Sequence, residues 1–87
     1  MSVSDRSLED AVLELLDSRA PGASVCPSDV ARAVHRSDDD GWRELMAPVR
    51  RAAARLAARG EVEITQHGTP VDPARDRGPV RIRRPSR

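Results

Sequence analysis

The stretch WRELMAPVRRAAARLAARG, from Trp42 to Gly60, decides the fold of this chain. In an α-helix each residue advances the side-chain direction by about 100°. If Val49 points into a core, the apolar residues gather around it on one face, namely Trp42, Leu45, Met46, Ala53 and Leu56, with Ala52 and Ala57 at the edges. The pattern predicts an amphipathic helix from about Asp40 to Arg59.

The other side of this helix is expected to face solvent. It carries Glu44, Ala47, Arg51, Arg55 and Ala58, with Arg43 and Arg50 on its flank. Pro48 is an irregularity, because a proline inside a helix removes a hydrogen bond and kinks the axis. We expect one kinked helix; the alternative is a new helix that begins at Pro48, after a short helical turn at residues 41–46.

Two shorter helices are predicted before this stretch. The first begins near Ser7, or one turn earlier at Ser4, and its apolar face comprises Leu8, Ala11, Val12, Leu15 and Leu16. After a turn at Pro21, residues 23–26 could pair as a short edge strand. The second helix begins at Pro27 and ends near His35 or Arg36, and the acidic turn SDDDG at residues 37–41 leads into the third.

A β-hairpin is predicted after Gly60, which ends the third helix. EVEITQ at residues 61–66 and PVRIRR at residues 79–84 alternate as strands do, with Val62, Ile64, Val80 and Ile82 inward. On the outward side, Glu61 and Glu63 could meet Arg81 and Arg83 across the ladder. The twelve-residue loop 67–78 between the strands carries Arg75 and Arg77.

The order of these elements predicts a mainly α fold with a small antiparallel β hairpin, that is, a winged helix-turn-helix of three helices plus a wing. We expect a single domain over residues 1–87, with a core of about 5–84 and flexible ends at 1–4 and 85–87.

The sequence also resembles a family of small uncharacterised bacterial proteins with a winged helix-turn-helix-like fold. The resemblance rests on VCPSDVAR at Val25–Arg32, WRELMAPVRRAAARLAARGEVEITQHG at Trp42–Gly68, VDP at Val71–Pro73 and GPVRIR at Gly78–Arg83. It implies the fold, but it carries no established activity, substrate or site residue.

The charge of the chain is divided unevenly along its length. The net charge is +1, but residues 1–47 hold five arginines against ten acidic residues, and residues 48–87 hold ten against four. A basic second half suggests an anionic partner. The alternative is that the two halves attract each other within the fold.

These features lead us to expect a DNA-binding module, as in transcriptional regulators, with double-stranded DNA as the partner. In winged helices the third helix enters the major groove and the wing contacts an adjacent groove or phosphates. Carried onto this chain, the DNA contacts are Arg43, Arg50, Arg51 and Arg55 on the helix and Arg75 and Arg77 on the wing. The alternative is a protein-interaction winged helix that binds no DNA and docks a protein partner or a second copy.

Other classes of function find little support. The spacings of Cys26, His35 and His67 match no zinc signature, and no catalytic motif or nucleophile-base pair is recognisable, so we expect no metal, no cofactor, no small-molecule substrate and no enzyme. The lone cysteine fits a reducing cytoplasm. The polar, acidic first residues lead us to expect no signal peptide, and the sequence has no apolar run of membrane-spanning length. Trp42, the single aromatic residue, is expected to pack in the core rather than to stack on a ligand.

Overall fold

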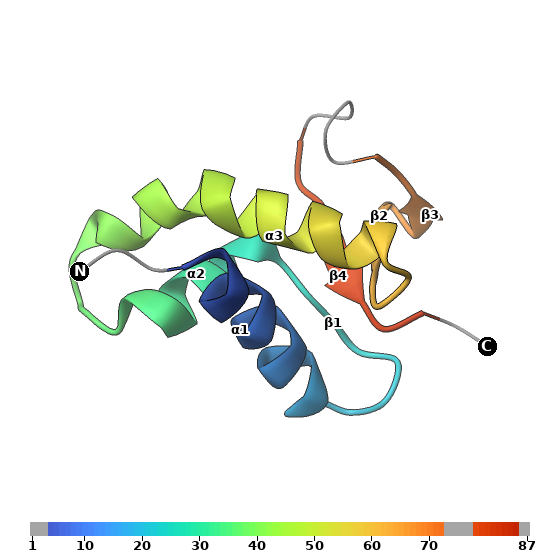
Figure 1. Ribbon diagram of the computed structural model, residues 1–87, viewed down its shortest axis with the longest axis horizontal. Helices are drawn as coiled ribbons and strands as arrows, with labels where there is room; N and C mark the ends of the chain where they lie inside the picture. Colours follow the sequence, from blue (N-terminus) through green and yellow to red (C-terminus); the bar gives the residue numbers. More distant parts are fainter. Residues whose placement is uncertain (1–3, 73–77, 86–87) are drawn as a thin grey trace.

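The computed structural model describes residues 4–72 and 78–85 and shows, within them, three α-helices, one 3-10 helix and a small antiparallel sheet (Figure 1). The helices are α1 (Asp5–Asp17), α2 (Pro27–His35), the 3-10 helix η1 (Asp40–Leu45) and α3 (Met46–Ala58). The strands are β1 (Ser24–Val25), β2 (Glu63–Gln66), β3 (Thr69–Pro70) and β4 (Arg81–Arg83). The predicted mainly helical chain with a small antiparallel sheet is confirmed, and its order is compatible with a winged-helix-like fold.

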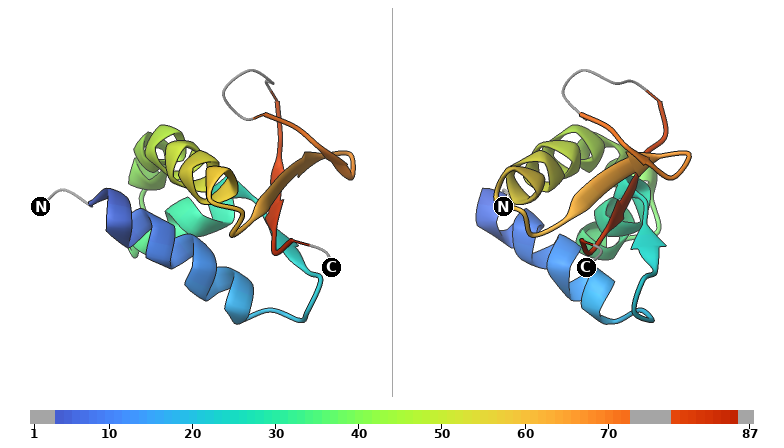
Figure 2. Two further views of the ribbon diagram at one scale, coloured as in Figure 1. Left: turned by 45° about the vertical axis from the view of Figure 1, so that its right-hand side comes forward. Right: turned by 90° about the vertical axis from the view of Figure 1, so that its right-hand side faces the viewer.

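The core lies where the helices meet the inner face of the sheet. Figure 2 shows α1 below α3, with the sheet closing one end of the helices. The buried side chains come from every predicted apolar face: Leu8, Val12, Leu16, Val25, Val30, Ala31, Val49, Ala52, Ala53, Leu56, Val62, Ile64, Val80 and Ile82. Ala11, Leu15, Val34, Trp42, Leu45 and Met46 are only partly buried and pack around this cluster.

Helix α1 begins at the earlier of its two predicted starts. The Ser4 side chain accepts a hydrogen bond from the Ser7 backbone N–H at 3.1 Å, so Ser4 is the N-cap. Ser7 therefore lies within the first turn, and the helix is one turn longer than a start at Ser7 would give.

The prediction of one kinked helix from Asp40 to Arg59 is wrong. A 3-10 helix, η1, comes first, and the α-helix begins at Met46. Pro48 is then the third residue of α3 and lies in its first turn, where an α-helix tolerates proline. The alternative of a short helical turn followed by a new helix is nearer to the structure. Gly60 ends α3 as predicted, with a φ of 76° and a hydrogen bond from the Glu61 N–H to the Leu56 carbonyl.

The sheet has the strand order β1-β4-β2-β3. Strands β2 and β4 pair antiparallel with Ile64 opposite Ile82, as the predicted hairpin requires. The predicted edge pairing of residues 23–26 is also confirmed, since β1 pairs with β4 and Val25 lies opposite Ile82.

The prediction of one continuous loop from residue 67 to 78 is wrong. His67 and Gly68 take φ values of 54° and 81°, and this two-residue turn folds β3 back along β2. Pro70 is accommodated because β3 is the edge strand, where a missing N–H costs no ladder bond. The sequence hides this hairpin, because two residues are too few to show an alternating pattern.

Candidate nucleic-acid interface

Three of the arginines expected to contact DNA are exposed or half-buried and have no acidic partner within residues 4–72 and 78–85. Arg51 is exposed on α3 and makes no hydrogen bond or ion pair with another described residue. Arg50 is half-buried and donates to the Gly78 carbonyl oxygen at 3.4 Å. Arg43 is exposed on η1, with its guanidinium carbon 4.7 Å from the centroid of the Trp42 ring. Arg75 and Arg77 lie outside the described residues.

Arg55 does not face outward as expected. Its Nε donates to Glu9 Oε2 at 2.6 Å, and its Nη2 donates to the Asp5 carbonyl oxygen at 3.3 Å. Arg59, the residue that follows α3, donates to the other oxygen of Glu9 at 2.6 Å and to Glu61 at 2.8 Å. The hydrogen bonds from these two guanidiniums, Arg55 first, hold the pKa of the Glu9 carboxyl below its ordinary value.

These contacts divide the arginines of α3 into two groups. The arginines on the flank toward α1 are bound by carboxylates of α1 and of the segment after α3, so they fasten the fold. Arg50 and Arg51 are not bound in this way. Arg84 likewise binds Asp17 of α1 at 2.8 Å, so the predicted attraction between the acidic and basic halves operates at more than one place.

Trp42 and two arginines form a cluster that the sequence reading missed in part. Trp42 is partly buried and packs against the core, and its ring also makes cation–π contacts with Arg43 of η1 and Arg32 of α2. The guanidinium carbon of Arg32 lies 4.3 Å from the ring centroid. No signal in the sequence joins positions 32 and 42, because the contact depends on how α2 packs against η1. For Arg43, the one hint in the sequence is its position directly after Trp42, the single aromatic residue.

The turn between α2 and η1 fixes the position of this cluster. Asp39 caps η1 by accepting from the Gly41 N–H at 2.9 Å, and it also accepts from Ser37 and contacts the His35 ring at 2.5 Å. These interactions, the one with His35 first, lower the pKa of Asp39 to about 2. Gly41 leaves room for the ring, since an added Cβ would lie 2.5 Å from His35 Cε1. His35, the last residue of α2, therefore ties α2 to η1.

The sheet arginines follow the predicted ladder only in part. Arg83 donates to Glu63 at 2.9 Å across β2 and β4, as expected. Arg81 instead reaches β1, donating to the Ser24 hydroxyl and carbonyl oxygens at 2.9 Å each. Glu61 binds Arg59, so the second predicted pair does not form.

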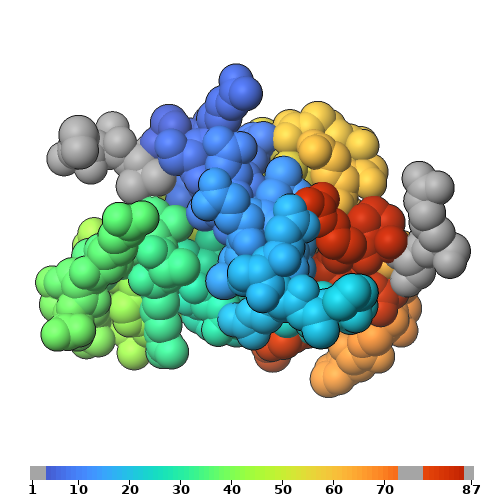
Figure 3. Space-filling model, turned by 90° about the horizontal axis from the view of Figure 1, so that it is seen from below, coloured from blue at the N-terminus to red at the C-terminus, as the bar shows by residue number. Residues whose placement is uncertain are grey.

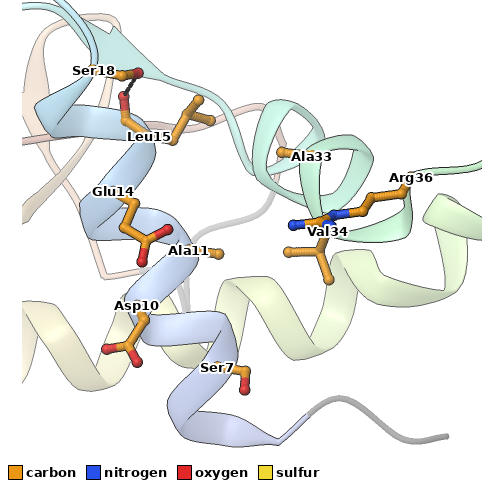
Figure 4. A pocket seen from close by; sticks show the side chains of 9 residues that line it. All are labelled: Ser7, Asp10, Ala11, Glu14, Leu15, Ser18, Ala33, Val34 and Arg36. Carbon is orange, nitrogen blue, oxygen red and sulfur yellow. Dashed lines mark hydrogen bonds between the residues drawn. The ribbon is translucent and has the colours of Figure 1, made fainter.

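An open groove of about 660 Å³ lies between α1 and α2. Figure 4 shows Ala11 and Leu15 of α1 facing Ala33 and Val34 of α2 across it. Charged residues border both sides, with Asp10 and Glu14 on α1 and Arg36 after α2. Figure 3 views this side of the molecule, where the blue surface of α1 lies beside the green of α2 and its following turn.

A metal-binding cluster and a membrane-spanning helix are both absent from the described part of the chain. It contains no group of three or more His, Cys, Asp and Glu side chains placed to hold a metal ion. Its helices are all too short or too polar to cross a bilayer.

Comparison with known proteins supplies a family but no activity. None of the curated proteins matches the sequence. A family model described as "Protein of unknown function (DUF3253)" matches residues 5–85, which include every helix and strand described above. The protein belongs to this family.

Proposed function

We propose that the protein is a winged-helix domain that binds double-stranded DNA, with α3 as the recognition helix. One observation carries the proposal: among the described residues, acidic side chains bind the arginines on the α1 flank of α3 but leave Arg50 and Arg51 without an acidic partner. Guanidiniums that have no acidic partner suit the phosphates and the base edges of DNA.

The arrangement of the elements supports the winged-helix part of the proposal. α2 is followed by a turn and then by η1 and α3, which run on as a longer helical segment, and the antiparallel pair β2–β4 closes the end of α3 as a wing would. In this proposal Arg51 points into the major groove, with Arg43 and Arg50 beside it. Arg75 and Arg77 between the strands contribute the wing contacts.

The net charge of the chain determines how tightly we expect it to bind DNA. With a net charge of +1, the domain lacks the strongly basic character of tight binders, so most of its affinity comes from a few phosphate contacts. We expect a Kd on the order of 1–100 µM on random duplex near physiological salt, falling steeply as salt is lowered.

Fluorescence anisotropy with a labelled random duplex tests the proposal. Arg51→Ala should weaken binding about tenfold, equivalent to the loss of one good contact. Arg6→Ala is the matched control, because Arg6 is also exposed and without a hydrogen bond or ion pair to another described residue, but lies on α1. Absence of binding at 25 mM salt would refute the proposal, as would equal losses in the two variants.

The groove between α1 and α2 favours a second candidate function, docking of a second copy of this chain. The groove offers apolar side chains flanked by Asp10 and Glu14 on one side and Arg36 on the other. Because it carries both signs of charge, a two-fold arrangement would set the acids of one copy against Arg36 of the other. Sedimentation velocity tests this reading: Leu15→Glu should abolish a dimer formed by the native chain. A native chain that stays monomeric at 1 mM would contradict it.

A further inference from the structure

We propose that Arg32, Trp42 and Arg43 together form a binding site for the phosphodiester backbone of DNA, a site that rests on the proposed DNA-binding function and specifies where the backbone is held. It would anchor the strand beside the start of the recognition helix.

The first support is that both guanidiniums are ordered by the same ring. The guanidinium carbons of Arg32 and Arg43 lie 4.3 and 4.7 Å from one indole centroid. The distance between these two carbons therefore cannot exceed the sum of the two values. The indole is held in turn by the core, since Trp42 is partly buried against it. Arg32 and Arg43 approach from different elements, α2 and η1, and the ring joins them.

The second support is that the donors of both arginines remain available. Each side chain is exposed, and neither makes a hydrogen bond or ion pair with another described residue. A cation–π contact uses the flat face of the guanidinium, whereas its five N–H groups lie in the plane and point outward. A phosphate binds along that edge through paired hydrogen bonds. The stack and the phosphate therefore do not compete.

The third support is preorganisation. An exposed arginine normally loses much rotamer freedom when it binds a ligand. Stacking on Trp42 has already restricted Arg32 and Arg43, so less freedom is lost on binding. The turn that positions η1 against α2 is itself fixed, through the contacts of Asp39 with Gly41 and His35.

The site has a defined role in the proposed complex. η1 runs directly into α3, because Leu45 keeps right-handed helical dihedrals where the two helices meet. A phosphate held at Arg43 thus lies at the leading end of the helix that carries Arg50 and Arg51. Phosphate contacts fix the orientation of a protein on the duplex, while base contacts supply sequence preference. The cluster is accordingly expected to position α3 without selecting a sequence.

The test uses the full chain and two independent signals. Trp42 is the single aromatic residue, so intrinsic fluorescence reports on this cluster alone. Titration with an unlabelled random duplex should change the emission of Trp42 along the same curve as the anisotropy of a labelled one. In Arg32→Ala and in Arg43→Ala, the slope of log K against log salt should become shallower by about 0.9, the value for one phosphate contact. Between 50 and 200 mM salt, each variant should lose roughly 3.5-fold less affinity than the native chain.

Controls separate this site from the proposed function and from a purely structural role. Arg6→Ala should leave the slope unchanged, and Arg32→Lys should keep the slope while losing the stack. A native chain that binds no duplex overturns both proposals. A native chain that binds, with Arg51→Ala weakened but the slopes of Arg32→Ala and Arg43→Ala unchanged, overturns the phosphate site alone. Variants that lower only the Tm show that the cluster serves to clamp α2 to η1, and this result also overturns the site.

Discussion

Replacing Leu56 by alanine should destabilise the protein strongly, because this side chain of α3 is fully buried in the core. The change removes three methyl or methylene groups, worth about 2.4 kcal/mol in transfer free energy. The cavity left behind adds to this, so we expect a loss of about 3 kcal/mol in the free energy of unfolding. A domain of this size has only about 4–13 kcal/mol in total. The Tm should fall by about 12–24 °C.

Urea unfolding, followed by far-UV circular dichroism and by Trp42 emission, measures this loss. The matched control is Leu15→Ala, the same chemical change at a partly buried position in the groove between α1 and α2. It should cost under about 1 kcal/mol, since little cavity is created where solvent already reaches. The m-values of both variants should stay close to that of the native chain. Equal losses at the two positions, or a loss below about 1 kcal/mol for Leu56→Ala, would refute the packing described for α3.

Three further predictions concern the arginines of α3 and the turn before η1. Arg55→Ala should lower the Tm by several degrees in a melting assay, because it breaks the contact with α1, and its folded form should bind duplex as the native chain does in anisotropy. Arg51→Ala should keep the native Tm and weaken duplex binding. Gly41→Ala should push the His35 ring away, so that the pKa of Asp39 rises from about 2 toward its usual 3.8 in a carboxyl carbon NMR titration. Because the folded pKa of Asp39 is depressed, its stabilising contribution is complete above pH 3.8 and is lost as the pH falls toward about 2, and acid unfolding curves of Asp39→Asn should lack that component.

Much of the fold could be predicted from the sequence because its signals are local. The spacing of Leu8, Val12 and Leu16 defines the buried face of α1, and all three are buried. The alternation around Ile64 and Ile82 defines the two central strands, and these residues lie opposite each other. Gly60 ends α3 through a backbone conformation that glycine adopts without strain.

The errors in the fold arise where local signals are ambiguous. Residues 40–45 have an apolar pattern that suits an α-helix or a 3-10 helix, and the structure has the tighter form, packed against α2. The turn at His67 and Gly68 needs two residues with positive φ, and histidine is not a typical choice there. Strand β3 was therefore hidden within the predicted loop.

The sequence by itself determined the faces of the helices, the central strands and the supply of arginines around Trp42–Gly60, because each follows from the spacing of neighbouring residues. Only the tertiary structure decided what each arginine does. Arg51 and Arg55 are one turn apart and look alike in sequence, but Glu9, 46 positions from Arg55, binds Arg55 and not Arg51. Likewise, Arg32 becomes part of a cluster with Arg43 only because packing brings α2 against Trp42. The partner of a charged side chain is set by distance in space, and distance in space is set by the whole fold.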